Sequence, residues 1–542
     1  MDGTVVQVAK PTLTEKAYFG SAYNFELSAA YVHTFAEKHT IDAKAVFTAA
    51  ENEGFNFEAY RKDYLSTTVD QLFAGSSIGM TNTGNAEEGG RLGFVGRLKY
   101  DYANRYYIEG SFRYDGSDNF APGHRWGFFP SVAAAWDITE EPFFKNLNLK
   151  NINLLKLRAS YGTTGTETNV NRFGYLSTYN MVENAVCIGG NLISGFNEGA
   201  LVSPDLLSWY TRRSLNIGID GSFLDNKLKG SADYFFYVTK GGLTSPADRY
   251  ITPLGTKLPQ IKSDNEHRRE GFELSLRWSD KIGSDIDYEI GANMISYRNL
   301  WVTNRGEGLS QLKNPYQRNT HQSDYLGLYL LDNGLYQSIE QVLGVPRRPE
   351  STETKLGDIV YQDINGDGKI NSEDKVRYGM PIDPHFTYGV DFLFAYKGFT
   401  LSGLFYGTGK RHMMFGVNAR KAESQYVKNK FQLDYWREDN RNATFPRISM
   451  VAGVNGENNR IESTFYLRNA AFLRLKNLSL TYDFKHKLLK SAKWLSTCQV
   501  SLTGSNLFTI SGVSDYWDPE TTNTNGGYPT SRIYSLGVTL GF

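Results

Sequence analysis

Apolar and polar residues alternate with a period of two along most of the chain, which predicts β-strands that have one apolar and one polar face. The last segment shows this most clearly, because one face carries Arg532, Tyr534, Leu536, Val538, Leu540 and Phe542. The other face carries small, polar or isolated apolar residues. We predict fifteen such strands, at residues 23–36, 39–51, 91–102, 104–115, 124–138, 153–163, 208–223, 227–240, 266–280, 285–299, 385–397, 399–414, 469–484, 495–509 and 531–542.

The predicted strands are long. They span roughly 10–15 residues, against about 5–6 in soluble proteins and about 9–11 for an oblique crossing of a bilayer. Short and long connections alternate, as in outer-membrane barrels with short periplasmic turns and long extracellular loops. The predicted long connections are 52–90, 164–207, 241–265, 300–384, 415–468 and 510–530. The pattern therefore predicts an all-β, antiparallel transmembrane β-barrel.

The composition supports this prediction and narrows the function. The 35 Tyr, 33 Phe and 8 Trp residues suit the aromatic girdles that barrels place at both membrane interfaces. The 58 Lys and Arg residues balance 58 Asp and Glu residues, so the basic excess of a nucleic-acid binder is missing. Two cysteines cannot form a disulfide framework. A soluble antiparallel β-protein with one solvated face is the alternative that alternation alone leaves open.

The number of predicted strands indicates whether the chain can form a whole barrel. Bacterial outer-membrane barrels have an even number of strands, with both ends in the periplasm. Fifteen strands traced back from Phe542 place residue 1 on the extracellular side, and the sequence MDGTVVQVAK lacks the features of a secretory signal. We therefore expect the chain to be the C-terminal part of a longer barrel protein.

Several motifs in succession resemble the SusC/RagA-type, TonB-linked outer-membrane transporters. The most distinctive is GDIVYQDINGDGKINSEDKVRYGMPIDPHFTYG at 357–389. SPDLLSW at 203–209 resembles the family's NPDLKWE-like element, with Ser203 in place of Asn. The others are RLGFVGRLKYDYANRYYIEGSFRYDGSDNF at 91–120, WGFFPSVAAAWDITEEPFF at 126–144, LLKLRASYGTTG at 154–165, FLRLKNLSLTYDF at 472–484, NLFTISG at 506–512 and DPE at 518–520.

This resemblance implies a 22-stranded barrel with an N-terminal plug and a TonB box. Neither the plug nor the TonB box is found in residues 1–542, so fifteen strands would be the C-terminal share of the barrel. The resemblance further implies a SusD-like surface lipoprotein as partner, coupling to the TonB complex through the missing N-terminal region, and oligosaccharide or oligopeptide substrates. It also implies that Phe542 is the barrel-assembly signal and that the protein lies in the outer membrane of a Gram-negative, Bacteroidota-like cell.

The segment DINGDGKINSED at 363–374 has the spacing of a twelve-residue calcium loop. Calcium needs six to eight hard oxygen ligands, and this spacing brings side-chain and carbonyl oxygens to one point. Asp374 stands where such loops usually have Glu, which weakens bidentate binding. A solvated Asn/Asp/Gly turn is the alternative. The candidate ligands are Asp363, Asn365, Asp367, Lys369 through its carbonyl, Asn371 and Asp374.

Aromatic residues in the loops are candidates for stacking on sugar rings, although they could equally anchor the loops. We single out Trp209, Tyr210, Trp301, Tyr516 and Trp517 as low-ranking candidates for substrate binding. Carboxylates on the polar face could pair as glycosidase acids, but barrel interiors are polar in any case. The sequence contains no constellation that indicates an enzyme.

Three functions remain at this point. The first is active import of nutrients as the barrel part of a TonB-dependent SusC-like transporter. The second is a self-contained, porin-like diffusion channel of about sixteen strands. The third is a soluble or surface-attached β-rich protein that binds glycans.

Overall fold

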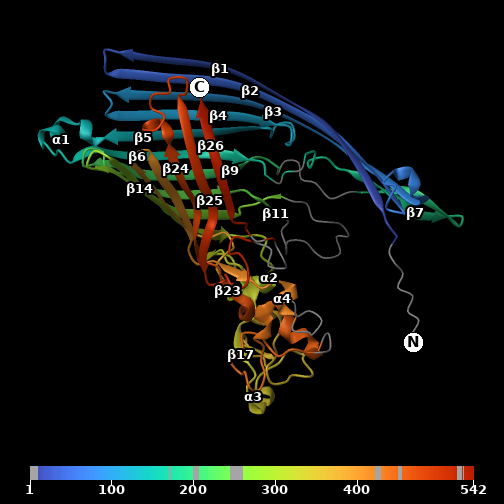
Figure 1. Ribbon diagram of the computed structural model, residues 1–542. Helices are drawn as coiled ribbons and strands as arrows, with labels where there is room; N and C mark the ends of the chain where they lie inside the picture. The colour runs from blue at the N-terminus through green and yellow to red at the C-terminus, as the bar shows by residue number, and fades with distance from the viewer. Residues whose placement is uncertain are drawn as a thin grey trace.

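A computed structural model of the chain describes residues 10–168, 170, 172–198, 207–244, 261–421, 429–449, 454–521, 528 and 530–542. Fifteen long strands of one antiparallel sheet each pair with the next one of the set, and a sixteenth, β15 (Gln322–Ser323), pairs only with β14 (Figure 1). All fifteen predicted strands are confirmed. They are β1 (Leu13–Phe35), β2 (His39–Lys62), β3 (Ser76–Tyr102), β4 (Tyr106–Ser117), β5 (Trp126–Asp137), β6 (Ile152–Thr166), β9 (Tyr210–Phe223), β10 (Leu228–Lys240), β13 (Glu266–Ile282), β14 (Ile286–Thr303), β20 (Phe386–Tyr396), β21 (Phe399–Thr408), β24 (Phe472–Asp483), β25 (Thr497–Ser511) and β26 (Ile533–Gly541).

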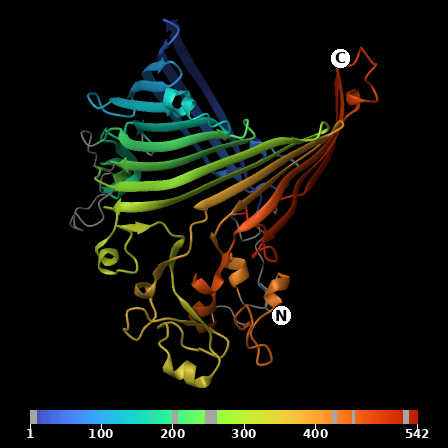
Figure 2. The ribbon, with the colours of Figure 1, turned by 90° about the vertical axis from the view of Figure 1, so that its left-hand side faces the viewer.

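The sheet curls strongly from β1, drawn in blue, to β26, drawn in red (Figure 2). Its two edge strands, β1 and β26, do not pair with each other in the described part of the chain. Among the helices that the structure describes, none is long and apolar enough to cross a membrane.

One end of the sheet carries tight turns. Ala103 and Asn104 both have φ of 55°, and Lys397 and Gly398 have φ of 46° and 90°. Two successive residues with positive φ are the signature of type I′ turns, whose twist matches that of antiparallel strands. At this end the only small helices are η2 (Ile138–Glu140), α1 (Pro142–Asn146) and η10 (Phe484–His486), within the described residues.

The predicted long loop at 52–90 is wrong. Strand β2 continues to Lys62 and β3 begins at Ser76, so only a short connection with η1 (Leu72–Ala74) remains. Residues 76–90 are mostly small and polar and show no apolar alternation, which is why the pattern missed them. They are strand because their backbone pairs with β2, along a ribbon in which Phe19 of β1 stacks on Phe55 of β2 at 5.1 Å between ring centroids.

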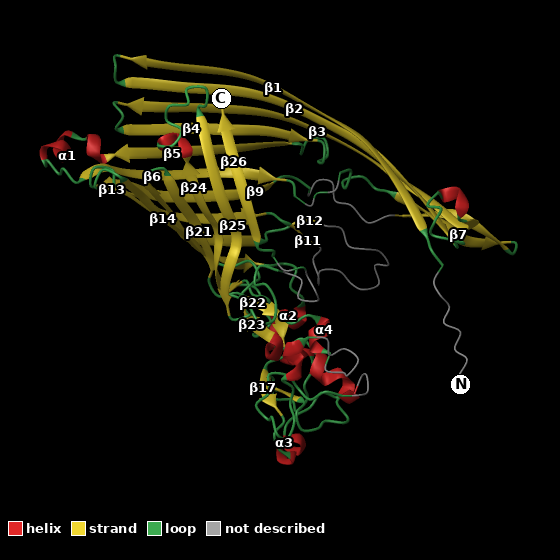
Figure 3. Cartoon of the chain, in the orientation of Figure 1, coloured by secondary structure: helices red, strands yellow, loops and turns green. Residues whose placement is uncertain are grey.

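The other long connections contain secondary structure of their own (Figure 3). The predicted loop 300–384 in particular begins later, because β14 runs to Thr303. The short elements are β7 (Tyr179–Ile188), β8 (Asn191–Glu198), β11 (Leu243–Thr244), β12 (Ile261–Lys262), α2 (Leu309–Lys313), β15 (Gln322–Ser323), β16 (Gly327–Tyr329), β17 (Asp332–Leu335), α3 (Ile339–Gly344), β18 (Ile359–Tyr361), η5 (Ser372–Asp374), β19 (Val376–Tyr378), β22 (His412–Met414), α4 (Val417–Arg420), η7 (Lys430–Leu433), η8 (Val454–Arg460), η9 (Thr464–Tyr466) and β23 (Leu467–Asn469).

Three of these connections fold together into a unit that we call the loop domain, made of described residues in 304–385, 409–471 and 512–521. Its core joins residues from separate connections: Ile359 and Tyr361 pack with Phe415 and Tyr466, and Trp517 packs against them. The loop domain, coloured yellow and orange, lies at the loop end of the C-terminal strands (Figure 1, Figure 2). Apolar burial thus holds the long connections in one place.

Aromatic side chains form two bands on the apolar face of the sheet. Eight to ten residues from the turn ends of β1–β3, neighbouring strands place Phe25 beside Phe47 and Phe47 beside Phe94, with centroids 6.3 and 5.1 Å apart. Near the turn end, the Phe399 and Tyr482 rings are 4.4 Å apart. On β4 the two bands are eight residues apart, from Tyr106 to Tyr114, or about 27 Å along the strand. With strands tilted by about 35–45°, this distance corresponds to a height of about 19–22 Å, close to the apolar belt of about 25 Å that the girdles flank.

A glycine on this face makes the packing testable. Gly96 of β3 lies directly across from Phe112 of β4, and a Cβ built on Gly96 would come within 2.4 Å of the Phe112 ring. We expect Gly96→Val to displace that ring and to lower the free energy of unfolding by about 1–3 kcal/mol. Thermal unfolding in detergent, followed by heat-modifiable gel mobility, measures this.

Gly110→Val is the matched control. Gly110 lies on the same face of β4 and has no atom within 4 Å of a built Cβ. We expect that variant to unfold like the parent. If both variants lost the same free energy of unfolding, the packing of Phe112 over Gly96 would be contradicted.

Candidate functional site

The polar faces of the strands carry charges that are neutralised across neighbouring strands. Arg158 of β6 pairs with Asp220 of β9 at 2.7 Å and with Asp233 of β10 at 3.0 Å. Arg277 of β13 pairs with Asp391 of β20 at 3.3 Å and also with Glu289 of β14. These carboxylates act as counter-ions that tie strands together. In a barrel this polar face lines the lumen.

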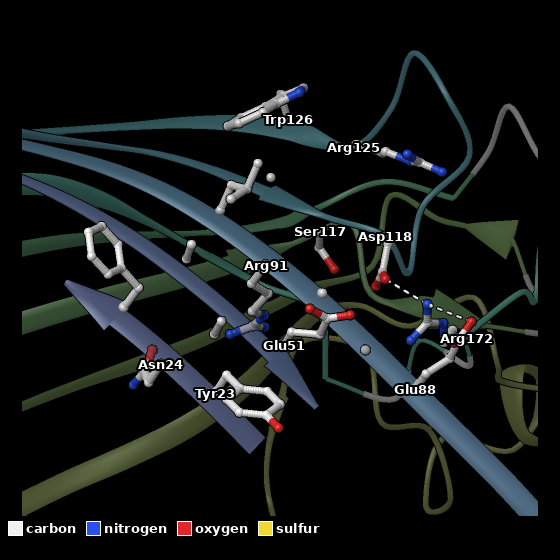
Figure 4. A pocket seen from close by; sticks show the side chains of 17 residues that line it. Tyr23, Asn24, Glu51, Glu88, Arg91, Ser117, Asp118, Arg125, Trp126 and Arg172 are labelled. Atoms are coloured by element: carbon white, nitrogen blue, oxygen red, sulfur yellow. Dashed lines mark hydrogen bonds and ion pairs between the residues drawn. The ribbon is translucent and has the colours of Figure 1, made fainter. Parts of the chain in front are cut away.

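A cavity of about 880 Å³ lies beside the middle of strands β1–β3 and the loop ends of β4 and β5 (Figure 4). Arg172 reaches into it and pairs with Asp118 at 2.7 Å and with Glu88 at 3.5 Å. Arg91 lies on the same wall and pairs with Glu167. Trp126 borders the opposite side. Acids and bases are balanced here, so the cavity offers a polar surface and little net charge. The cavity could not be predicted from the sequence, because its residues come from six separate segments.

The candidate aromatic residues Trp209 and Tyr210 are buried, with 8% and 6% of their surfaces exposed. The Trp209 ring packs against Phe120 and Phe129 at 5.3 and 5.4 Å, and its Nε1 donates to the carbonyl of Arg125 at 2.9 Å. In this arrangement Trp209 anchors the start of β9 to the 118–125 turn. Residues 203–206 of the motif SPDLLSW lie outside the described residues.

The other aromatic candidates lie apart from this pair. Trp301 belongs to β14, not to a loop, and its ring meets His267 of β13 edge-on at 5.0 Å. Tyr516 and Trp517 pack on Phe415 in the loop domain at 5.1 and 4.6 Å. The five residues therefore do not form one site, and a role of each in substrate binding stays a prediction.

The candidate calcium ligands lie together in one compact turn. Asp363 accepts hydrogen bonds from the amides of Gly366 and Gly368 at 2.7 and 2.8 Å. The side chain of Asn365 accepts from the Asp367 amide at 3.0 Å, and the side chain of Asp367 accepts from Lys369 at 2.8 Å. Such local side-chain to backbone bonds also stabilise turns without a metal.

Asp374 closes this turn and is fully buried. Its carboxylate accepts from the amides of Ile364 and Asn371 at 2.9 and 2.8 Å, and no described Lys, Arg or His forms an ion pair with it. Within the described residues, no group of three or more His, Cys, Asp or Glu side chains has the arrangement of a metal site. The turn thus has the donors that calcium prefers, while the carboxylates engage the turn's own amides.

Asp358, which precedes this turn, connects two parts of the loop domain. It is fully buried and pairs with Arg447 at 2.6 Å. It also accepts from the side chains of Asn455 and Asn459, each at 2.8 Å, and from the Lys355 amide at 2.9 Å. A buried carboxylate with four donors holds residues about 90–100 positions apart in sequence.

Buried tyrosines in the same core stay neutral. Burial raises the pKa of the Tyr361 and Tyr466 phenols above the usual range. Tyr361 donates its hydroxyl to the carbonyl of Asn458 at 2.7 Å, and Tyr466 donates to that of Asn459.

At the edge of the domain, Arg474 of β24 pairs with Asp518 at 2.7 Å. Burial alone would raise the Asp518 pKa, but the Glu520 amide and Arg474 lower it below its usual range.

Phe542, the proposed assembly signal, follows β26 at the turn end of the sheet. Its ring is 82% exposed and stacks on Trp494 at 6.0 Å between centroids. It lies in the aromatic band of that end. Its role in assembly stays a prediction.

The chain is similar in sequence to TonB-dependent receptors. The family model described as TonB dependent receptor-like, beta-barrel, matches residues 6–507. TonB-dependent receptor P3 of Formosa agariphila is 27% identical over 535 residues, which cover 92% of this chain and 50% of that protein. TonB-dependent receptor SusC of Bacteroides thetaiotaomicron is 26% identical over 475 residues, covering 83% of this chain and 44% of SusC.

Among solved structures, the RagAB peptide importer in its open-open state matches with a TM-score of 0.78. The two chains are 22% identical, and the match covers 98% of this chain and 55% of that one. This likeness shows the fold. The chain spans about half the length of the relatives it matches.

The junction at Asp358 gives a test of the loop domain. We expect Asp358→Ala to destabilise this domain by about 3–5 kcal/mol, because it leaves the Arg447 guanidinium buried without a counter-ion. Limited proteolysis should then cut within residues 304–385 or 409–471, while the sheet keeps its heat-modifiable gel mobility.

Asp439→Ala is the control, since Asp439 forms an exposed pair with Arg437, with 78% and 46% of the side chains exposed. Such pairs contribute about 0–1 kcal/mol. If the protease cut the Asp358 variant no faster than the Asp439 variant, the Asp358 ion pair would not be what holds the loop domain together.

Proposed function

Because the chain belongs to the TonB-dependent receptor family through its β-barrel region, as its SusC/RagA-type motifs indicated, we propose that it is the barrel part of an active importer of nutrients. The transported molecules would be oligosaccharides or oligopeptides. The observation that carries the proposal is the family match over residues 6–507, on a sheet whose polar face and long folded loops suit a gated channel. A receptor family also accords with the expectation that the chain is not an enzyme.

The proposed location is the outer membrane of a Gram-negative, Bacteroidota-like cell. The aromatic bands and the exposed apolar residues of β26 support it, since Tyr534, Leu536 and Val538 are 70%, 74% and 62% exposed. A soluble β-protein would have to cover this face with a second sheet. No described part of the chain does so.

The proposed partners are a SusD-like surface lipoprotein and the TonB complex. The loop domain supports the first, because it offers a folded surface on the side where a lipoprotein partner would dock. The TonB complex would supply the energy for import. A porin-like channel remains the second candidate, since charged strands with a polar lumen serve passive diffusion as well.

Energy dependence separates import from diffusion. Cells that produce the full protein should take up a labelled substrate, identified from growth on panels of oligosaccharides and peptides. A protonophore or loss of TonB should reduce that uptake to the background of cells lacking the gene. Uptake that persists without TonB or the proton-motive force would instead establish a diffusion channel.

We also propose that the turn at 363–374 binds calcium as a structural ion. The donor set supports this, because every candidate ligand offers a hard oxygen and calcium takes six to eight of them. The fully buried Asp374 supports it further, since a cation would offset the charge that amides alone now meet. Asp363, Asn365, Asp367, Asn371 and Asp374 would bind through side chains, and Lys369 through its carbonyl. No step of transport depends on this ion.

A calcium titration tests this assignment. Adding calcium should raise the melting temperature of the parent protein, and chelation should reverse the rise. The pair Asp363→Ala and Asp367→Ala should abolish the calcium response. The pair Glu353→Ala and Glu373→Ala removes the same charge from exposed positions outside the ligand set and should keep it. If calcium did not change the melting temperature of the parent protein, the assignment would be refuted.

A further inference from the structure

Four neighbouring strands bring cationic and aromatic side chains together on the polar face, near their loop ends. The register places Arg212 of β9 in one row with Thr239, His267 and Trp301 of the next three strands. The adjacent row contains Ser214, Tyr237, Arg269 and Asn299. The row below it ends at Tyr297 of β14. We call this set the arginine patch: Arg212, Tyr237, His267, Arg269, Tyr297 and Trp301.

The two arginines of the patch differ from the others on this face. Arg158, Arg277 and Arg113 each form an ion pair with a carboxylate. Arg212 and Arg269 form none with any residue that the structure describes. Arg212 instead lies over the ring of Tyr237, 4.1 Å from its centroid, and Arg269 lies over Tyr297 at 4.7 Å.

Packing beneath the patch fixes these rings in place. Phe235 is only 3% exposed and stacks on Tyr237 at 5.1 Å. It packs close to Gly271, where a Cβ would come within 2.8 Å of the Phe235 ring and 2.3 Å of the Ser296 carbonyl. The Arg269 Nε donates to the Asn299 side chain at 2.6 Å, which sets the plane of that guanidinium. The cations are therefore held in position before any ligand arrives.

Carboxylates next to the patch do not neutralise it. Two acids among the described residues, Asp383 and Asp324, lie close to Tyr297. Asp324 accepts from Asn299 at 2.8 Å and pairs with His385 at 3.0 Å. Below the patch, Arg158 engages Asp233 and, one row further, Asp220. Glu273 of β13 stands in the row of Asp233, two rows below Arg269, and forms no ion pair among the described residues. Two half-buried guanidinium groups thus face the lumen without a protein counter-ion in the described chain.

We propose that the arginine patch is a binding subsite for the carboxylate or sulfate groups of an acidic oligomer that passes through the lumen. A guanidinium presents paired N–H donors that match such oxyanions, and an aromatic ring below it keeps the fork in place at little entropic cost. Low local dielectric strengthens the contact over one at the surface. This inference rests on the proposed function and adds the charge class of the substrate to it.

Binding is measured apart from transport, on the purified protein in detergent. The probes are a uronic acid oligosaccharide, a glutamate-rich peptide of equal length and a neutral oligosaccharide. We expect at least one acidic probe to bind more tightly than the neutral one, with an affinity that falls as salt is added. The pair Arg212→Gln and Arg269→Gln should weaken acidic binding by about 10- to 100-fold.

The opposite face of the same strands supplies the matched control. Arg213 and Arg268 are the sequence neighbours of the two arginines, and alternation places them on the other side of β9 and β13. The pair Arg213→Gln and Arg268→Gln removes the same charge and should change affinity by less than about twofold. If the first pair fails to fold, Arg212→Lys with Arg269→Lys carries the test, because it keeps the charge and loses the fork.

The outcomes are distinct. Binding of one acidic probe alone supports the subsite and identifies the source of the oxyanion. Equal affinity for acidic and neutral probes, equal losses in both glutamine pairs, or unchanged binding in the lysine pair would overturn it. If uptake did not depend on TonB, active import would be refuted, but the affinities measured on the purified protein would still test the subsite.

Discussion

The whole structure depends on the need to pair every backbone N–H and C=O that faces lipid. Hydrocarbon offers no hydrogen-bonding partner, so a spanning chain must satisfy these groups within itself. Fifteen strands meet this need with one antiparallel ladder, except along the outer edges of β1 and β26, which do not pair with each other in the described chain. The ladder in turn fixes alternation, since each strand must present one side chain to lipid and the next to the interior. Tight turns at one end and folded connections at the other follow from this arrangement.

Because side chains alternate, apolar packing stabilises one face of the sheet and ion pairs stabilise the other. On the apolar face, aromatic rings meet across strands and cover small residues such as Gly96. On the polar face, charges meet in pairs, as Arg158 does with Asp220 and Asp233. Among the arginines of this face, Arg212 and Arg269 have no such pair with a described residue. Exceptions of this kind are where a transported molecule can contribute the missing partner.

Much of the sheet could be predicted from the sequence, and the reason is local. Strands such as β26 alternate strictly, so their period is visible within ten residues. Residues 76–90 could not be predicted, because they are strand only through pairing with β2, which sequence periodicity does not encode. The same limit applies to the sites. The spacing of the 363–374 turn is local and was visible, whereas the arginine patch is assembled by the register of four strands. Trp209 was singled out as a loop aromatic that could stack on a sugar or anchor its loop, and its packing on Phe129, which is set by tertiary structure, buries it.

The loop domain has a consequence for the order of folding. Its core unites connections that leave the sheet at different strands, and Ile359 and Tyr466 are more than 100 residues apart. Contacts this distant in sequence form slowly, because the chain must first close long loops at an entropic cost. The domain can complete its core only when β14, β20, β21, β24 and β25 hold their positions. Protection of its amides from hydrogen exchange would therefore appear late in assembly, which makes the domain a natural reporter that this side of the sheet has finished folding.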